Sequence, residues 1–518
     1  MGASREKRVR KTITQQNQAN KKKKEETSSL AIRILAGFVI VLVVFGVAAV
    51  ILYAANIPQR LFAAMTVGDI KVTPAEYNVY YMMVRNDVYT EWQNNSQDPT
   101  SQENAANFIL EVQYKTEQNI QSTVALADVA RKNGAVLSDD NKTYLDSQLS
   151  SLSDGAREQS ISVGQYLEQI YGKGVTQTIY EKYLNDSLLA NQWITAQVDT
   201  FTHDQAEYDA YYAENRDAVD TLDFRCYVSA PETLGDDATD EEKTAAQDAA
   251  KAKAQAIVDG SSSEDAFVAA VLENASESEK EGLQNDPDTT LSRNVRITEL
   301  GNADSYAFSW VNEEQRTWLV DPARKAGDVT LTEYGEGQYF IVFFYLSRQR
   351  PDYYPVNVRH ILFQFKDDED AVTTTPTDEQ KAAAKQKADD ELAKWKAGEA
   401  TEDSFAALAD ADTDDTGNVS SDGSTNGGLY QGILKGAMVA PFEAWCFDTA
   451  RKPGDTGIVE TSYGFHVMYF VSNNETLQWI NIVKGSMATD DVNNYLESTN
   501  ANYPLVKKDY GMSMTIKE

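Results

Sequence analysis

Two of the three histidines in this sequence, His360 and His466, stand at the two ends of one segment, 354–474. Each lies in a strand-like context, Val358-Arg-His-Ile-Leu362 at the start and Tyr463-Gly-Phe-His-Val467 at the end. Imidazole is the only side chain whose ordinary pKa lies near neutrality, so such a pair can both donate and accept hydrogen bonds at physiological pH. The alternative is a pair of buried structural histidines, and the residues between them decide which interpretation holds.

Length and charge narrow the class of protein. At 518 residues the chain has room for roughly three or four domains. Its net charge is −33, but residues 1–33 hold ten Lys/Arg against three Asp/Glu, a charge of +7 that leaves −40 for the other 485 residues. So acidic a body argues against nucleic-acid binding, because the phosphate backbone would repel it. We therefore expect no nucleic-acid partner.

A charge-free run at 34–55 predicts one transmembrane helix. Its 22 residues are rich in Val, Ile, Leu, Ala and Phe, long enough to cross a hydrocarbon core of about 30 Å. The basic tail 1–33 precedes it, and cationic flanks stay on the cytoplasmic side. A cleaved signal peptide is the alternative, but its apolar core is usually about 7 to 15 residues long. We expect a single-pass protein of the cell membrane with a cytoplasmic N-terminus and most of the chain outside.

The segment from 65 to 201 has the apolar spacing of helices. Apolar residues recur every three or four positions in Pro74–Val88, Ala105–Asn133 and Val163–Gln197. Thr73 is predicted to cap the first of these helices, together with Glu76 three residues on. Mixed strand and helix patterns begin near 217 and begin again at 354, so the fold class is predicted to be α+β.

The two mixed regions, 217–350 and 354–474, form an internal repeat. Asp223-Phe-Arg-Cys-Tyr-Val228 corresponds to Asn357-Val-Arg-His-Ile-Leu362. Further along, Trp318-Leu-Val-Asp-Pro-Ala-Arg-Lys-Ala-Gly-Asp-Val329 matches Trp445-Cys-Phe-Asp-Thr-Ala-Arg-Lys-Pro-Gly-Asp-Thr456. Several matches in the same order at similar spacing predict two copies of one module.

The copies differ where chemistry would lie. His360 is replaced by Cys226 in the first copy and His466 by Tyr339, while Met438 and Phe442 are replaced by Val311 and Gln315. The framework persists without the polar centre, as expected when one copy keeps an activity and the other is degenerate and keeps only its fold.

The second copy resembles the parvulin-type peptidyl-prolyl cis/trans isomerases. The matching motifs are the His-containing first strand, Leu408-Ala-Asp-Ala-Asp-Thr-Asp-Asp415, Gly427-Gly-Leu-Tyr430, Met438-Val-Ala-Pro-Phe-Glu443 and Tyr463-Gly-Phe-His466. The resemblance covers about 354–474. Tyr430 stands where the family usually has leucine, and the loop 416–426 before it is long. The family's fold is a small antiparallel sheet with surrounding helices.

The chain as a whole resembles extracytoplasmic foldases of the PrsA/SurA kind. That resemblance implies a helical chaperone domain at 65–201 completed by 475–518, and partners that are unfolded or nascent secreted proteins. The alternative is a non-catalytic holdase or surface-interaction protein that uses both modules as scaffolds. The oligomeric state is not written in the sequence.

Isomerisation of an X-Pro bond requires no cofactor or metal and no nucleophile. The planar amide opposes rotation with a barrier of about 18 to 20 kcal/mol, so the site must bind the twisted amide more tightly than the planar one. The resemblance casts His360, Asp415 and His466 as catalytic groups. It casts four residues as substrate-binding, Tyr430, Met438, Phe442 and Phe465. The loop Lys366-Asp-Asp-Glu-Asp370 lacks the basic cluster that phosphate-directed isomerases need, which argues against a phospho-Pro substrate.

Two cysteines, Cys226 and Cys446, complete the set of reactive side chains. Outside a membrane they could pair, but each lies in an apolar stretch, where cysteine acts as a small hydrophobic residue. The sequence favours two free, buried thiols.

Overall fold

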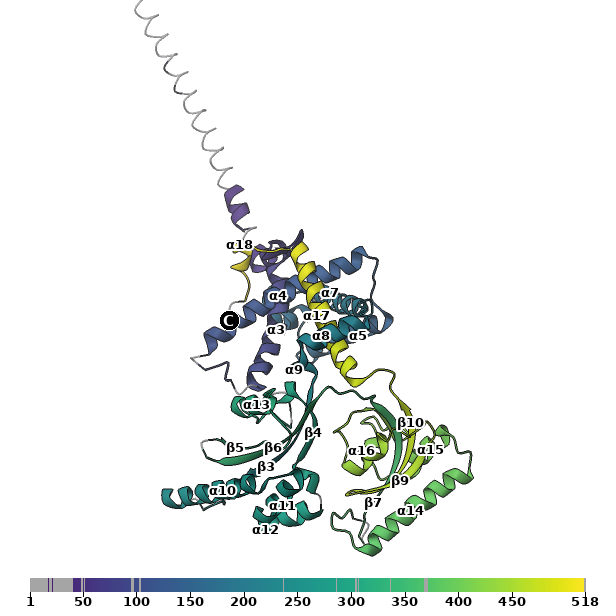
Figure 1. Ribbon diagram of the computed structural model, residues 1–518. Helices are drawn as coiled ribbons and strands as arrows, with labels where there is room; N and C mark the ends of the chain where they lie inside the picture. The colour runs from purple at the N-terminus through teal and green to yellow at the C-terminus, as the bar shows by residue number, and fades with distance from the viewer. Residues whose placement is uncertain are drawn as a thin grey trace, which may run out of the picture. The chain divides into compact units, whose positions relative to one another are not determined.

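A computed structural model describes residues 52–516 except 95–96, 102–103, 236, 286, 303–304, 306, 336 and 368–370, together with residues 17, 21, 41–47 and 50 (Figure 1). The chain divides into two compact units. One holds the chain up to Thr202 together with Thr489–Glu518, and the other holds His203–Ala488. The long helix α17 (Gln478–Asn502) contains the boundary between the units.

Much of the predicted transmembrane segment, residues 34–40, 48–49 and 51, lies outside the described residues, as does nearly all of the basic tail. Among the residues that are described, no helix is both long enough and apolar enough to span a bilayer. The membrane anchor stays a prediction.

The first unit packs helices around a small three-stranded sheet. The sheet has the order β11-β1-β2, and β1 pairs antiparallel with both neighbours. Its elements are β1 (Met65–Val67), β2 (Ile70–Val72), α3 (Pro74–Asn94), α4 (Ala105–Lys132), α5 (Asp139–Glu158), α6 (Val163–Tyr171), α7 (Gln177–Val198), β11 (Leu505–Lys507) and α18 (Asp509–Met512), with α2 (Ile57–Leu61) before them. The core joins β1, α3 and α4 through side chains such as Met65, Tyr81 and Ile120.

Local signals place these helices well, with one exception. Thr73 and Glu76 form the predicted reciprocal cap, since the Thr73 N–H donates to Glu76 Oε2 (2.6 Å) and the Glu76 N–H to Thr73 Oγ1 (3.3 Å). The helical spacing across 163–197, however, covers two helices, α6 and α7. The chain leaves the helix at Gly172 and Gly174, both at positive φ, a conformation that glycine adopts without steric cost.

The second unit contains two four-stranded antiparallel sheets. The first has the order β4-β3-β6-β5, and strands β3 and β6 lie at its centre. Its strands are β3 (Thr221–Ser229), β4 (Leu291–Arg296), β5 (Val329–Tyr334) and β6 (Tyr339–Gln349). Around them lie α10 (Asp240–Gly260), α11 (Glu264–Asn274), α12 (Glu277–Asn285), η1 (Pro287–Thr290), η2 (Ile297–Glu299) and α13 (Glu313–Val320). The short helices α8 (Gln205–Glu214) and α9 (Arg216–Val219) precede this sheet.

The second sheet has the order β8-β7-β10-β9, with β7 and β10 at its centre. Its strands are β7 (Val356–Gln364), β8 (Leu429–Ile433), β9 (Thr456–Thr461) and β10 (Gly464–Asn473). Helices α14 (Asp378–Ala397) and α15 (Glu402–Asp412) cover one face, and α16 (Ala440–Cys446) lies on the other (Figure 1). A short turn, η3 (Thr416–Asn418), follows α15. Helical and sheet regions of this kind confirm the α+β class.

The cysteines form no disulfide with one another. Cys446 is buried beside β10, as predicted, whereas Cys226 is only partly buried in the first sheet. Burial raises the pKa of each thiol to about 12, so both are protonated at neutral pH.

Candidate active site

The two histidines meet on neighbouring central strands of the second sheet. In the antiparallel pairing of β7 with β10, His360 lies opposite Met468 and His466 opposite Leu362. Both side chains point to the face that carries α16, and both are buried. The two Nδ1 atoms are 3.1 Å apart. The pairing of β7 with β10 therefore brings together two histidines that are 106 positions apart in the chain.

Asp415 extends the histidine pair on one side. Its Oδ2 lies 3.0 Å from His360 Nε2 and accepts a hydrogen bond from the Tyr430 hydroxyl at 2.9 Å. Its Oδ1 accepts from the Gly417 N–H at 3.0 Å at the start of η3. The bond from His360 holds the pKa of Asp415 well below its ordinary range, helped by the Gly417 and Tyr430 bonds and opposed by burial. An ionised carboxylate only accepts, so His360 Nε2 carries a proton.

Thr461 extends the pair on the other side. Its Oγ1 lies 2.9 Å from His466 Nε2, accepts from the Tyr463 N–H at 3.1 Å and lies 3.4 Å from the Gly464 carbonyl oxygen. A continuous chain of hydrogen bonds therefore runs from Tyr430 through Asp415, His360 and His466 to Thr461.

This chain is satisfied with either one or two imidazole protons on His360. When His360 is neutral, its Nδ1 accepts from His466 Nδ1–H, and His466 Nε2 accepts from the Thr461 hydroxyl. When His360 is cationic, its Nδ1–H donates to His466, whose Nε2–H donates to Thr461, and the Thr461 hydroxyl turns to the Gly464 carbonyl. His466 is neutral in both arrangements. Every buried donor and acceptor of the network has a partner in both arrangements.

Burial shifts the pKa of two groups in the network, His466 and Tyr430. It lowers the pKa of His466 to about 3, an effect that His360 strengthens and Asp415 opposes. It raises the pKa of Tyr430 to about 12, with the bond to Asp415 adding to the rise. At neutral pH the site therefore offers a neutral imidazole and a protonated phenol.

Aromatic rings enclose the histidines. Phe442, on α16, meets both imidazoles edge to face, with ring centroids 5.4 Å from His360 and 5.3 Å from His466. Tyr430 approaches His360 with its ring centroid at 4.9 Å. Met438, just before α16, packs against the same apolar cluster. Apolar and aromatic side chains therefore surround the hydrogen-bond chain of the two histidines.

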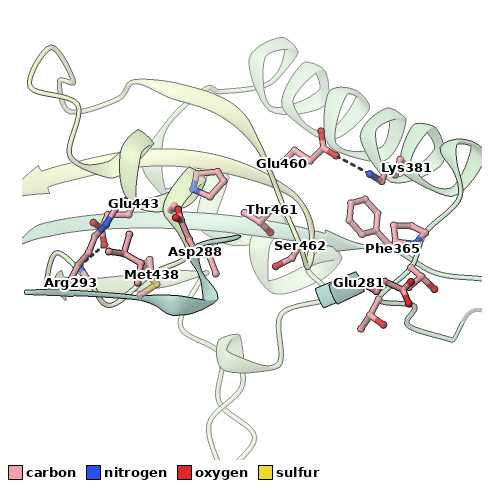
Figure 2. Close-up of a pocket in the computed structure, with 18 residues that line it drawn as sticks. Glu281, Asp288, Arg293, Phe365, Lys381, Met438, Glu443, Glu460, Thr461 and Ser462 are labelled. Carbon is pink, nitrogen blue, oxygen red and sulfur yellow. Dashed lines mark hydrogen bonds and ion pairs between the residues drawn. The ribbon is translucent and has the colours of Figure 1, made fainter. Parts of the chain in front are cut away.

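A pocket of about 630 Å³ opens beside this network (Figure 2). Met438 lines it near one end, Phe365 lies at the other, and Thr461 and Ser462 lie between them (Figure 2). Because Thr461 also bonds His466, the pocket reaches the end of the hydrogen-bond chain. The volume is within the range of about 300–1,000 Å³ usual for ligand pockets.

Residues 342–474 match the family model of the PPIC-type PPIase domain. The chain therefore carries a parvulin-type peptidyl-prolyl isomerase domain. A crystal structure at 1.70 Å of the peptidylprolyl isomerase PrsA from Bacillus anthracis is similar at 18% identity, covering 32% of this chain and 58% of that one, with a TM-score of 0.18. The chain thus spans little more than half of that structure's length. We infer nothing from a TM-score this low. No curated protein matches the sequence.

The isomerase domain brings six of the seven predicted site residues together: His360, Asp415, Tyr430, Met438, Phe442 and His466. Phe465 does not join them. It packs in the cluster on the opposite face of the sheet, with its ring centroid 5.9 Å from that of Phe365. Neighbouring residues of a strand point to opposite faces, so the Phe465 ring lies on the other face of the sheet from the His466 ring. The catalytic and binding roles of the six stay predictions.

Sequence reasoning missed Thr461 in the isomerase domain, although β9 carried a signal. Val459 lies opposite His466, and Thr461 pairs with Gly464 beside the turn. Alternation along β9 puts Val459 and Thr461 on the face of His466, where a hydroxyl can reach the ring. Glu443 was also missed. This buried carboxyl accepts from the Gly436 N–H at 2.5 Å, and burial raises its pKa.

The pKa of His466 predicts an acid-sensitive isomerase domain. Unfolding restores an ordinary pKa of about 6.5, so between pH 6.5 and about 3 the unfolded chain binds a proton that the folded chain does not. Stability is fully present above pH 6.5 and falls by up to about 1.4 kcal/mol per pH unit below it. We expect denaturant midpoints of the His466→Gln variant to change less from pH 7 to pH 4.5 than those of the parent chain.

The third histidine, His203, lies outside the isomerase domain and provides the control. His203 Nδ1 lies 3.6 Å from Glu207 Oε2, a partner that is also outside that domain, so a His203→Gln variant should keep the parent's pH dependence for an unfolding signal that comes from the isomerase domain. Asp415, whose pKa is lowered, contributes its loss only below about pH 4, so it does not obscure this window. Parallel pH curves for His466→Gln and the parent would contradict the prediction.

Proposed function

We propose that the protein is a membrane-anchored extracytoplasmic foldase, which isomerises X-Pro bonds in secreted proteins and keeps them from aggregating while they fold. The observation that carries the catalytic part is the hydrogen-bond chain through His360 and His466 beside the pocket. Rotation about an amide breaks no covalent bond. Pre-organised hydrogen-bonding groups and an apolar slot for the proline ring are therefore enough for catalysis. Met438, which lines the pocket, forms the slot for the proline ring, and the buried Phe442 supports it within the same apolar cluster.

A comparison of two fragments tests the catalytic part. We expect residues 350–475 to isomerise unphosphorylated X-Pro peptides and residues 217–350 not to, once circular dichroism shows that both are folded. Equal rates for the two fragments would contradict the assignment. Absence of turnover from both fragments and from the full chain would favour the non-catalytic holdase.

The first sheet of the second unit is, on this proposal, an inactive copy of the isomerase domain. Its strand order β4-β3-β6-β5 parallels β8-β7-β10-β9. Two interactions recur at matching positions. Arg225 Nε bonds Glu264 (2.8 Å) as Arg359 Nε bonds Glu402 (3.0 Å). Likewise, Arg324 and Arg451 each lie 4.0 Å from the ring centroid of a tryptophan six residues earlier. Such polar details would not be expected to recur in unrelated sheets.

The strand register corrects one match between the copies. Cys226 lies opposite Phe343 as His360 lies opposite Met468, which puts Ile341, and not Tyr339, at the position of His466. The hairpin between β5 and β6 is two residues longer than the one between β9 and β10, which shifts the alignment. Gln315, at the position of Phe442, is buried and donates to Thr332 Oγ1 at 3.1 Å. A single buried polar pair has replaced the histidines and their ring.

Membrane anchoring rests on the sequence. The uncharged run 34–55 and the basic tail before it support a cytoplasmic N-terminus and an outward-facing body with a charge near −40. Clients would then be proteins that have crossed the membrane unfolded. The acidic body keeps exposed apolar surface soluble by self-repulsion.

The helical unit is the proposed chaperone. Leu110 and Tyr114, one turn apart on α4, are each 64% exposed, and Val136 is 73% exposed. Exposed apolar side chains on a soluble surface offer binding sites for unfolded chains. We expect residues 57–518 to suppress aggregation of an unfolded model protein even when both His360 and His466 are replaced, as light scattering would measure.

Two further variants locate that activity. The double variant Leu110→Ser, Tyr114→Ser should weaken suppression. Val372→Ser removes a similarly exposed residue of the isomerase domain and should leave suppression unchanged. Suppression should be weaker for acidic clients, and salt should reduce this difference over a Debye length of about 8 Å. If suppression disappears with the histidines, the division of labour is wrong.

A further inference from the structure

The pocket beside the histidines has a second wall, and that wall comes from the first sheet. Glu281 of α12, Asp288 of η1, and Leu291 and Arg293 of β4 line it opposite the residues of the isomerase domain (Figure 2). β4 is an edge strand, paired on one side only with β3. The inactive copy therefore takes part in the surface that a client of the active copy would meet.

The two walls touch at Gly436. A Cβ atom at this position would collide with the backbone carbonyl oxygen of Arg293, and the φ of +88° is one that other residues rarely adopt. The Gly436 N–H donates to Glu443, the buried carboxyl next to Phe442 in the chain. Gly436 also lies two residues before Met438. The strand that carries Arg293 thus adjoins the slot assigned to the proline ring.

Most charges in the pocket already have partners. Asp288 pairs with Arg225 at 2.9 Å, and Glu460 lies 3.9 Å from Lys381. Arg293 and Glu281 are exposed, and in the described part of the chain no ion pair involves either of them. Glu281 lies at the end near Phe365, whereas Arg293 lies at the end near Met438 and Glu443 (Figure 2). Burial raises the pKa of the Glu443 carboxyl and the charge of Arg293 opposes that rise, and the exposed guanidinium of Arg293 is a cation at the end of the pocket nearest the proline slot.

We propose that Arg293 is a substrate-binding residue of the isomerase, one that receives the carboxylate of a client Asp or Glu adjacent to the proline. The inference rests on the proposed function, since it takes Met438, supported by Phe442, as the proline slot. A guanidinium presents several donors in a plane that matches a carboxylate. The inactive copy would then set the sequence preference of the active one.

Peptide kinetics with the full chain test the assignment. The probes are unphosphorylated peptides that differ only in Glu, Gln or Lys directly before or directly after the proline. For the parent chain we expect kcat/KM to be about two- to fivefold higher for Glu than for Lys at one of these positions, the size of an exposed ion pair. The difference should lie mainly in KM, because the contact exists before and during rotation. Arg293→Ala should remove the preference and Arg293→Glu should reverse it.

Matched variants separate this role from general damage. Lys325→Ala removes an exposed cation of the same sheet region outside the pocket and should keep the preference.

Gly436→Ala should weaken the preference by pushing β4 away. Gly454 has a similar φ of +90°, and a Cβ atom there would meet only the Tyr469 hydroxyl, at 4.0 Å. Gly454→Ala should therefore leave the preference unchanged. Equal effects of the two glycine variants, or an unchanged preference in Arg293→Ala, would overturn the proposal. Loss of turnover with every peptide in the parent chain would instead refute the proposed function.

Discussion

Replacing both His360 and His466 with alanine is expected to lower kcat/KM for X-Pro isomerisation by about a hundredfold, the usual cost of removing pre-organised polar groups from a site. The two rings share one hydrogen bond of 3.1 Å and link Asp415 to Thr461. Without the two rings, the carboxylate of Asp415 loses the donor His360, and the pocket loses the hydrogen-bond chain beside it. An isomer-specific peptide assay on the full chain measures the loss.

The single histidine variants should each cost nearly as much as the double variant. Residues that act through one network are not additive, because breaking the chain at either ring disconnects its ends. His203→Ala is the control and should keep the parent's rate. A folded double variant with the parent's turnover would show that the histidines are structural.

Phe442→Ala is expected to destabilise the isomerase domain by about 3 to 5 kcal/mol, since it removes a fully packed ring from the core. The ring is 3% exposed and meets both histidines edge to face. That loss is a large fraction of the roughly 5 to 15 kcal/mol that stabilises a typical domain. Chemical denaturation of the full chain, followed by a signal from the isomerase domain, measures it.

Phe442→Leu separates stability from turnover. A swap between apolar side chains of similar volume usually costs less than about 1.5 kcal/mol, so this variant remains folded. It still loses the aromatic contacts with the histidines, and kcat/KM should fall about threefold to tenfold. Phe447→Ala, in the same cluster but packed against Tyr353, should destabilise the domain less and leave turnover unchanged. A turnover loss in Phe447→Ala equal to that in Phe442→Leu would contradict the assignment.

The histidine pair could be predicted from sequence because each histidine lies in a short strand-like motif that matches the family pattern. The same reasoning supplied Asp415, which belongs to a continuous motif ending at η3. Phe465 was assigned to the site although it adjoins His466. The alternation of side chains along a strand puts Phe465 on the opposite face from His466, a geometry that the motif alone does not supply. Tyr430 was predicted as a substrate-binding residue, and the bond from its hydroxyl to Asp415 was not foreseen.

Other features depend on contacts that no local pattern specifies. The position of Arg293 beside Gly436 depends on how two sheets pack, and the sequence holds no periodic signal for it. Ile341 was missed as the counterpart of His466 because the longer β5–β6 hairpin shifts the alignment without changing the flanking pattern. Helical spacing continued across Gly172 and Gly174, since periodicity records which face is apolar and not where the backbone turns.

The sheet of the first unit has a consequence for the order in which the protein folds. Its central strand β1 pairs with β11, and Met65 lies opposite Lys507 near the far end of the chain. In addition, Gln121 of α4 donates to the carbonyl oxygens of Asn500 and Tyr503. A ribosome makes β11 only after it has made the whole of the second unit, so this sheet cannot close before that unit has been synthesised. The sheets of the second unit hold all their strands within the interval and can close sooner. The first unit, whose first strand is made before the second unit, therefore closes its sheet after it.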